Sequence, residues 1–398
     1  MSLREVGDVP AFAFGSGLTA LGVLRSLQAS GVPVFSVCPR EDLATKSRWF
    51  RPAPLMSGAV PEPAQLAEYL AALRVSRAVL FPCSDDWARA IAELPDTLKE
   101  RFPASVPDAP VVETMTDKWR FSTFLECVGV PRPKTLRVSS MEELHSLDEA
   151  SYENMFLKPV DSQDFARRTN VKAFRLEGKN HALRIMEDLL ANGGAGFPIL
   201  LQEYIPGPAS SYYLVDGFVD ANGDTRALIP RRRLSQYPRF FGNSARSETI
   251  PLSEVRGAVA ALERMWSTVT YRGIFDAEFK YDERDKQFKI LEVNARPWWF
   301  VEFATRCRMD LCRMAYLDAL GLPVESVSEY DVGRRCVYLN YDLAAHLGTD
   351  SGPGGVLRWM RSFGGVEDII YRWDDPWPGL HSTFSALKNY RRHRRKSG

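Results

Sequence analysis

Three oxygen-bearing side chains share a hairpin-like segment at 275–295, FDAEFKYDERDKQFKILEVNA. Side chains two residues apart lie on the same face of a strand, so Glu278 lies on one face of a first strand and Glu292 and Asn294 share a face of the returning strand. The charged turn Asp282–Lys286 is centred near residue 285, which brings Glu278 and Glu292 close together. Two carboxylates and an amide oxygen suit a Mg²⁺ ion that bridges nucleotide phosphates. The alternative is an exposed hairpin face with ordinary cross-strand pairs.

Two upstream lysines could supply positive charge to the same chemistry. Lys158 ends a short strand in Phe156-Leu157-Lys158-Pro159, where its ammonium group could meet phosphate oxygens. Lys118 lies 40 residues earlier, and the strand-like Gln202-Glu203 follows 44 residues after Lys158. A single exposed lysine is usually only solvated. These residues therefore indicate a function through their order along the chain and not individually.

An arginine-rich strand is the candidate substrate contact. Arg231 and Arg233 share one face of a strand, and either guanidinium could clamp a substrate carboxylate with two hydrogen bonds. Ser244 follows closely, and Trp298 could form a wall of an acceptor pocket. The competing interpretation is a solvated basic strand, with Trp298 used for packing.

A glycine turn near the N-terminus has two readings. Gly15–Ala20 matches G-x-G-x-x-A between a strand and a helix, the turn that brings backbone N–H groups to a dinucleotide pyrophosphate. Such a site also requires an acid near the end of the second strand, and Glu41 lies several residues too late. The turn equally fits a Rossmann-like domain that binds no cofactor.

The elements around this turn predict a parallel sheet. Continuous apolar strands alternate with amphipathic helices, a pattern typical of parallel sheets covered on both faces. The expected strands lie at 11–14, 32–37 and 77–83. The Pro-rich segment 102–110 then marks a boundary.

A different pattern follows from residue 112 onward. A helix at 117–130 leads to a strand at 199–205, which stops at Pro206-Gly207. Two hairpins are predicted, at 211–229 around Asn222-Gly223-Asp224 and at 275–295. Antiparallel strands that carry polar side chains on one face would position the carboxylates and arginines above.

The composition excludes several protein classes. The chain has 398 residues, 45% hydrophobic and 25% charged, with a formal net charge of +1, as in ordinary globular proteins of two or three domains. No apolar run is long enough to span a bilayer, and the N-terminal MSLREVGDVP does not resemble a secretory signal. The six cysteines form no CxxC pair, which fits reduced thiols in a cytoplasmic protein.

The strongest local charge lies at 388–396, KNYRRHRRK, with six Lys or Arg residues and no acid. The rest of the chain is mildly acidic, so no nucleic-acid partner is expected. The basic segment could contact an anionic membrane surface, but such segments are more often solvated, frayed ends. A homodimer is the default assembly.

The chemistry-bearing residues form an ordered series along the chain. The series is Lys118, Lys158-Pro159, Gln202-Glu203-Tyr204-Ile205-Pro206-Gly207, Glu278 and Glu292-x-Asn294-x-Arg296. It resembles the ATP-grasp superfamily, and more narrowly the amino-acid and peptide ligase branch related to D-aspartate ligase and the large chain of carbamoyl-phosphate synthase. The resemblance covers roughly residues 112–323, and the first 111 residues resemble the domain that precedes the grasp in that family.

The resemblance implies how ATP would bind. Lys118 and Lys158 would hold the α- and β-phosphates, while Glu203 and the backbone of Ile205 would read the adenine edge. The family usually has a glycine-rich lid after the second lysine, whereas residues 161–170 contain no glycine. A lid would then contact phosphate through the side chains of Ser162, Gln163, Arg167 or Arg168.

The resemblance also implies the metal ligands and the catalytic residues. Glu278, Glu292 and Asn294 would coordinate one or two Mg²⁺ ions, with Mn²⁺ as an alternative ion. Arg296 would stabilise the transferring γ-phosphoryl group together with Lys158. The family member's basic substrate residue matches Arg233. Where its ribose-binding acid usually stands, after Gly207, this chain has Ser210 and Ser211.

The predicted architecture is α/β. A Rossmann-like domain (1–111) precedes a small lobe with its lid (112–205), a large lobe with the Mg²⁺, ATP and substrate site (206–323), and a C-terminal extension with the basic segment (324–398). The predicted activity is ATP-dependent joining of a carboxylate to an amine, an amino acid in the first instance, through an acyl phosphate. Three rivals remain open: a bicarbonate-using carboxylase or carbamoyl-phosphate-forming enzyme, a nicotinamide-dependent oxidoreductase, and a non-catalytic nucleotide binder.

Overall fold

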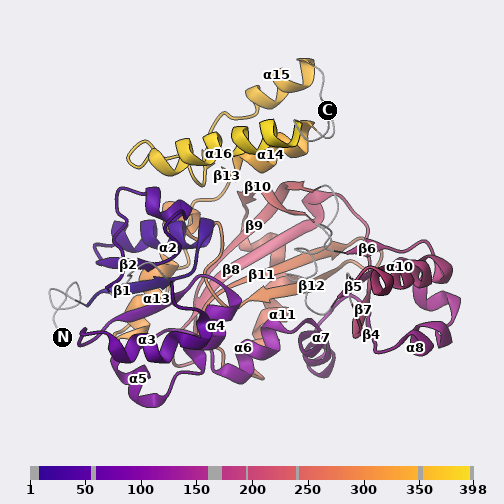
Figure 1. The fold of residues 1–398 in the computed structure, drawn as a ribbon, viewed down its shortest axis with the longest axis horizontal. Coiled ribbons are helices and arrows are strands. Elements are labelled where there is room, and N and C mark those ends of the chain that lie inside the picture. The colour runs from indigo at the N-terminus through magenta and orange to yellow at the C-terminus, as the bar shows by residue number, and fades with distance from the viewer. Residues whose placement is uncertain are drawn as a thin grey trace.

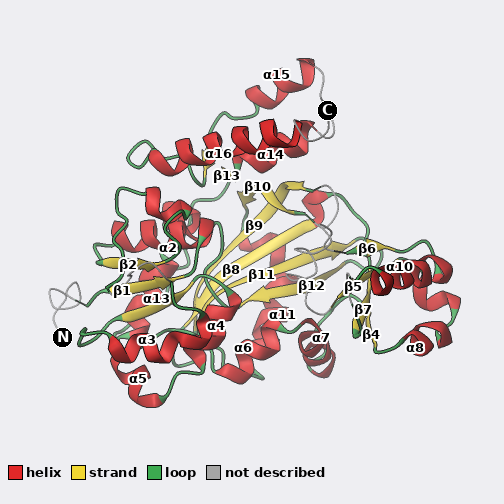
Figure 2. Cartoon of the chain, viewed as in Figure 1, coloured by secondary structure: helices red, strands yellow, loops and turns green. Residues whose placement is uncertain are grey.

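The computed structural model describes residues 9–54, 60–159, 173–193, 196–238, 242–347 and 353–394. The predicted lid at 161–170, with Ser162, Gln163, Arg167 and Arg168, lies outside the described residues, as does the end of the basic segment. The described chain builds three sheets with helices packed around them (Figures 1 and 2). The predicted α/β class is confirmed.

The first sheet is parallel, as predicted, because its apolar strands are buried on both faces. Its order is β2-β1-β3, with β1 at Ala11–Phe14, β2 at Val34–Val37 and β3 at Val79–Pro82. The helices of this region are α2 (Gly17–Ala29), α3 (Leu66–Ala72), α4 (Asp85–Ala92), α5 (Asp96–Arg101) and α6 (Ala109–Thr116). The 3-10 turns η1 (Leu43–Lys46) and η2 (Pro63–Gln65) connect them.

The second sheet is small and antiparallel, in the order β4-β7-β5-β6. Its strands are β4 (Thr135–Val138), β5 (Met155–Pro159), β6 (Phe174–Arg175) and β7 (Ile199–Glu203). Leu157 and Leu201 face a core shared with α8 (Met141–Ser146) and α10 (Lys179–Ala191). Because strand side chains alternate, Lys158 and Gln202 project from the opposite face of this sheet.

The third sheet has seven strands in the order β12-β11-β8-β9-β10-β13-β14, and both predicted hairpins lie within it. The strands are β8 (Tyr212–Val219), β9 (Thr225–Tyr237), β10 (Asn243–Thr249), β11 (Gly273–Asp282), β12 (Gln287–Asn294), β13 (Arg335–Val337) and β14 (Val366–Asp368). One face packs on α11 (Arg256–Trp266) and α7 (Lys118–Cys127), and the other packs on α12 (Val301–Arg306) and α13 (Leu311–Ala319). The short turns η4 (Ala209–Ser211) and η5 (Leu252–Val255) complete this part, whereas η3 (Glu149–Tyr152) packs in the core of the small sheet.

The N-terminal region and the large lobe share part of their apolar core. Leu24 of α2 and Phe303 of α12 belong to one buried apolar cluster, so the N-terminal region and the large lobe pack as one unit. The boundary expected at residue 111 falls inside α6. The division into four domains therefore stays a prediction.

The C-terminal region contacts both the large sheet and the N-terminal region. Strands β13 and β14 extend the large sheet, and three helices follow or separate them: α14 (Leu339–Leu347), α15 (Pro353–Arg361) and α16 (Trp377–Arg394). Figure 1 shows these helices gathered at one end of the molecule, beyond β10. In the described part of the chain, no helix combines the length and the apolar character needed to cross a bilayer.

Candidate active site between the four-stranded and seven-stranded sheets

The paired carboxylates meet across the hairpin in the predicted register. Glu278 of β11 is the ladder partner of Glu292 of β12, and Asp276 is the partner of Asn294. Glu292 is exposed and Glu278 is half-buried. Side chains of ladder partners project to the same face, so Glu278, Glu292 and Asn294 form one oxygen-rich surface.

Glu278 forms an ion pair with the predicted substrate residue Arg233. Nη2 of Arg233 donates to Oε2 of Glu278 at 2.7 Å, and its Nε donates to Oγ of Ser244 at 2.8 Å. The Arg233 side chain is almost completely buried. Burial raises the pKa of Glu278 to about 7, against the opposing influence of the guanidinium. Arg233 and Ser244 are therefore brought to the carboxylate pair by β9 and β10.

The donor set at this surface fits a magnesium ion. Mg²⁺ prefers carboxylate, amide and water oxygens, and the Glu278–Glu292 pair with Oδ1 of Asn294 offers these groups. The Nδ2 of Asn294 donates to Oδ2 of Asp276 at 2.9 Å, which turns Oδ1 away from Asp276. Among the described residues, no group of three or more His, Cys, Asp or Glu side chains is arranged to hold a metal ion. Any ion here would thus rely on two carboxylates, one amide and non-protein ligands.

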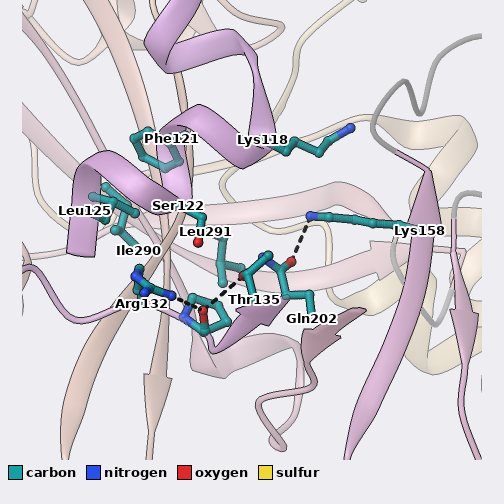
Figure 3. Close-up of a pocket in the computed structure, with 11 residues that line it drawn as sticks. Lys118, Phe121, Ser122, Leu125, Arg132, Thr135, Lys158, Gln202, Ile290 and Leu291 are labelled. Carbon is teal, nitrogen blue, oxygen red and sulfur yellow. Dashed lines mark hydrogen bonds between the residues drawn. The ribbon is translucent and has the colours of Figure 1, made fainter. Parts of the chain in front are cut away.

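The two predicted phosphate lysines line one small cavity. Lys118, the first residue of α7, and Lys158, on β5, border a cavity of about 10 Å³ with Gln202 and Leu291, and Figure 3 shows the amine of Lys158 directed at Gln202 and that of Lys118 extending in the opposite direction. Nζ of Lys158 donates to Oε1 of Gln202 at 2.8 Å. Burial, and then the neighbouring Lys118, lower the pKa of Lys158 to about 7, whereas Glu292 acts in the opposite direction. Lys158 therefore lies within electrostatic range of both Lys118 and Glu292.

Arg296 is held by a residue that the sequence did not single out. Its Nε donates to Oδ1 of Asp85 at 2.7 Å, and its Nη2 donates to Oδ2 of the same carboxylate at 3.4 Å and to Oδ1 of Asn294 at 3.3 Å. Asp85 begins α4, directly after β3 of the N-terminal sheet. The N-terminal region thus orients the arginine that follows the metal-site strand. A partner 211 residues away leaves no periodic signal in the sequence.

The side chain of Glu203 already has several partners. Its carboxylate is paired with Arg284, lies 3.7 Å from Nζ of Lys289, and accepts from the N–H of Lys134 at 3.1 Å. Ile205 is buried directly after β7. An adenine contact by the Glu203 carboxylate would have to share it with these cations.

Arg231 and Trp298, both predicted substrate residues, lie in the interior. The Arg231 side chain is 1% exposed, pairs with Asp216 through Nε at 2.5 Å, and reaches Asp276 at 3.5 Å. The ring centroid of the buried Trp298 lies 5.5 Å from the guanidinium carbon of Arg231. Burial and the neighbouring Asp216 raise the pKa of Asp276 well above its usual value. Arg231 is therefore the counter-ion of the buried Asp216 carboxylate.

The glycine turn is explained by packing. A Cβ on Gly15 would come within 2.9 Å of the Cys83 Cβ, and the residue has a φ of +125°. The first N–H of α2, from Gly17, donates to Oδ2 of Asp42 at 2.8 Å. A side-chain carboxylate therefore occupies the position that a pyrophosphate would take, and Glu41, the expected acid, is exposed.

A larger cavity of about 790 Å³ lies between the large sheet and the C-terminal helices. Tyr212 and Gln236 line it and also contact Arg233, since the Tyr212 ring centroid lies 4.2 Å from the guanidinium carbon and Oε1 of Gln236 accepts from Nη1 at 3.2 Å. Lys280 lines it with a pKa lowered by burial to about 8. On the opposite side, Trp359 comes from α15. The cavity thus ends one side chain away from the Arg233–Glu278 pair.

The chain is similar to known proteins in sequence over part of its length and in fold over most of it. No protein-family model matches the chain. A D-aspartate ligase of Enterococcus faecium (strain Aus0004) is 25% identical over 248 residues, a match that covers 60% of this chain and 58% of that relative. The chain therefore matches less than two thirds of the relative's length.

Solved structures share the fold over most of the chain. An L-amino acid ligase from Bacillus licheniformis has a TM-score of 0.58 at 14% identity, covering 82% of this chain and 78% of that one. The biotin carboxylase domain of Hydrogenobacter thermophilus 2-oxoglutarate carboxylase, in complex with MgADP, ADP and bicarbonate, has a TM-score of 0.61 at 15% identity, covering 81% and 73%. The chain thus has the same fold as an L-amino acid ligase and a biotin carboxylase domain, and it is similar in sequence, over part of its length, to a D-aspartate ligase.

Proposed function

We propose that this protein is an ATP-dependent ligase that joins a carboxylate to an amine through an acyl phosphate and releases ADP and phosphate. The observation that carries the proposal is the convergence of three groups. Lys118 and Lys158 share one cavity, Glu292 acts on Lys158 electrostatically, and the ladder pairs Glu292 with Glu278. Cations and metal-binding carboxylates around one space are the parts that phosphoryl transfer requires.

ATP would lie between the four-stranded sheet and the seven-stranded sheet. Lys118 and Lys158 would hold the α- and β-phosphates, and the Glu203 and Ile205 strand end would receive the adenine edge. Because Glu203 is engaged with Arg284, we expect the base to depend mainly on backbone groups at this strand end. Phosphate oxygens near Lys158 would favour its charged form, against the effect of burial.

The proposed Mg²⁺ site would assist the same phosphoryl transfer. Glu278, Glu292 and Asn294 would hold Mg²⁺, for which Glu278 exchanges its ion pair with Arg233. When bound, the ion would neutralise charge on the phosphate oxygens. Arg296, fixed by Asp85, would donate hydrogen bonds to the γ-phosphoryl oxygens.

Two bond exchanges complete the proposed reaction. A substrate carboxylate oxygen attacks the γ-phosphorus, the bond to ADP breaks, and an acyl phosphate forms. The amine nitrogen then attacks the acyl carbon, phosphate leaves, and the nitrogen loses a proton. The freed guanidinium of Arg233, next to Ser244, would hold the substrate carboxylate with paired hydrogen bonds.

The substrates would enter through the cavity beside Arg233. A volume of about 790 Å³ exceeds the need of a single small amino acid and is within the usual range of ligand pockets. Tyr212, Tyr237 and Trp359 line it with aromatic surface, and Lys280 adds a cation. We infer that at least one substrate is bulky and carries an anionic group.

The test is release of ADP and phosphate from MgATP across amino acids and small or bulky carboxylates, offered singly and in pairs. Release that requires two substrates, with a product mass equal to their sum less water, is the expected outcome. Release with bicarbonate alone would replace the ligase by a carboxylase-type enzyme. ATP binding by thermal shift without release under any combination would favour a non-catalytic nucleotide binder, and absence of ATP binding would overturn the proposal.

A further inference from the structure

The large exposed apolar side chains of the described residues are concentrated in the C-terminal helices. Nine such side chains are exposed in the described chain, and six of them lie between residues 357 and 384. These six are Leu357, Met360, Trp373, Trp377, Leu380 and Phe384. Trp373 is fully exposed, and Trp377 and Phe384 are 64% and 69% exposed. Soluble monomers rarely leave aromatic residues gathered in this way, so the surface calls for a binding partner.

Helix α16 is attached to the protein through its small and polar side chains. Nδ2 of Asn340 donates to Oγ of Ser382 at 3.0 Å, and the hydroxyl groups of Tyr371 and Thr383 lie 2.5 Å apart. Gly379 packs so closely on Tyr371 that a Cβ would come within 2.5 Å of the ring. The face of α16 that packs on the protein is therefore polar, whereas the packed face of an ordinary surface helix is apolar.

The outward face of α16 carries the apolar residues. Trp377, Leu380 and Phe384 follow one another at spacings of three and four residues, which places them on one side of the helix. All three are exposed, and Trp373 precedes them by four residues. We name Trp377, Leu380 and Phe384 the aromatic stripe.

Positive charge continues from the aromatic stripe along the same helix. No acid occurs from residue 376 to residue 398, whereas Lys388, Arg391, Arg392 and Arg394 follow the stripe within α16. Helix α15 adds Arg358 and Arg361 in its last turn, beside exposed Leu357 and Met360. Apolar surface and cations thus occur together with no opposing charge on the helix.

We propose that α16 lies on anionic phospholipid membranes, with the aromatic stripe inserted at the headgroup level and its basic half over the lipid phosphates. Tryptophan prefers this interfacial region, and lysine and arginine gain from a negatively charged leaflet. A helix with an apolar face and a cationic end binds in the plane of the interface and does not cross the membrane. The charge favours a membrane over an apolar protein groove, because a groove would contact only the stripe, whereas an anionic leaflet would also attract the basic residues that follow it in α16.

The position of α16 is compatible with this role. Figure 1 shows α14, α15 and α16 at one end of the molecule, away from β4, β5 and β7. Docking through the outward face would leave the hydrogen bonds of Ser382 and Thr383 intact.

The test is co-sedimentation of the full chain with vesicles of phosphatidylcholine alone and of phosphatidylcholine mixed with phosphatidylglycerol, at low and high salt. We expect binding to the anionic vesicles only, weakened by salt, with a blue shift of tryptophan fluorescence. The double variant W377S/F384S should reduce partitioning about tenfold or more, and R391Q/R392Q/R394Q should do the same at low salt.

The matched control is L190S/V332S, which removes two exposed apolar side chains elsewhere and should bind like the wild type. Thermal melts should agree among all variants, because the substituted stripe residues are exposed. Absence of wild-type binding to anionic vesicles, or equal binding by W377S/F384S, would overturn the proposal. A wild-type dimer that W377S/F384S converts to a monomer, without vesicle binding, would assign the stripe to a second copy of the chain instead.

Discussion

Lys158 shows how burial can prepare a single residue for an anionic ligand. Its ammonium group lies in a small cavity against Gln202, and the pKa is lowered from 10.5 to about 7. Between these values the unfolded chain carries the proton and the folded chain does not, so this side chain contributes stability that rises with pH across that window. Bound phosphate would reverse the effect by favouring the ammonium form.

The first prediction is a proton uptake on ATP binding. Just above pH 7, the neutral Lys158 should take up a proton when phosphate binds, which calorimetry detects as a heat that depends on the ionisation enthalpy of the buffer. Lys158→Gln should abolish this dependence and weaken ATP binding about tenfold or more, since a charge-assisted hydrogen bond is lost. Lys286→Gln, at an exposed lysine of the β11–β12 turn, is the control. Unchanged ATP affinity in Lys158→Gln would remove its assignment to the phosphates.

The second prediction concerns Glu292. Because this side chain is exposed, Glu292→Ala should leave the thermal melt nearly unchanged while lowering Mg²⁺-dependent ATP turnover by about 100-fold or more. Glu283→Ala provides the comparison, since Glu283 is an exposed glutamate in the turn of the same hairpin. Turnover by Glu292→Ala at the level of Glu283→Ala would contradict the metal assignment.

At the scale of elements, the site depends on where a helix from one sheet meets a strand from another. Helix α4 begins at Asp85 because Ser84 caps it, its Oγ accepting from the N–H of Trp87. That start places the Asp85 carboxylate against Arg296, just beyond the end of β12. The N-terminal region thus acts on the proposed reaction through one carboxylate.

The third prediction tests Asp85 as a positioning residue. Asp85→Asn should lower kcat about 10- to 100-fold with a smaller change in the KM for ATP, because Arg296 loses its orientation toward the transferred group. Asp86→Asn, the neighbouring residue of α4, carries an exposed side chain paired with Arg89 and should behave like the wild type. Equal kcat values for the two variants would make the Asp85–Arg296 pair purely structural.

At the scale of the whole molecule, a buried arginine joins the two ends of the chain. Arg25 of α2 is 1% exposed and contacts Asp375 at 2.9 Å, Glu302 at 3.4 Å and the carbonyl oxygen of Ile370 at 2.9 Å. The Asp375 carboxylate also accepts from Oγ of Ser47 at 2.8 Å. A charge buried with partners from three regions holds the C-terminal segment to the N-terminal region.

The fourth prediction follows from this network. Arg25→Met leaves Asp375 buried without its counter-ion and should lower the free energy of unfolding by about 3–5 kcal/mol, measured by urea denaturation. Arg48→Met removes an exposed arginine that donates to the carbonyl oxygen of Asp374, and should cost about 0.5 kcal/mol or less. A loss in Arg25→Met no greater than that in Arg48→Met would show that the network does not stabilise the fold.

Much of the fold could be predicted from local pattern. The three apolar strands of the first sheet, the two hairpins and the helix at α7 all appear where periodicity and turn residues indicated them, because they depend on residues close in sequence. The register of Glu278 with Glu292 followed from the position of one turn. Local order therefore also determined which carboxylates face each other.

Contacts between residues distant in sequence could be identified only from the tertiary structure. Strand periodicity could not separate Arg231 from Arg233, since both share a strand face. In the structure the buried Arg231 pairs with Asp216, whereas Arg233 contacts Glu278 and Ser244. Likewise, Asp42 rather than Glu41 reaches the glycine turn. These choices depend on which strand or loop packs nearby, and chain periodicity contains no record of that.

The C-terminal extension shows the same division. Its composition indicated a basic segment. The apolar side chains of α16 face outward only because Gly379, Ser382 and Thr383 pack on Tyr371 and α14. The sequence by itself determined the strands, the hairpins and the order of the chemistry-bearing residues. Tertiary packing alone decided which charges are neutralised inside and which side chains stay available, because burial and ion pairing depend on contacts between distant segments.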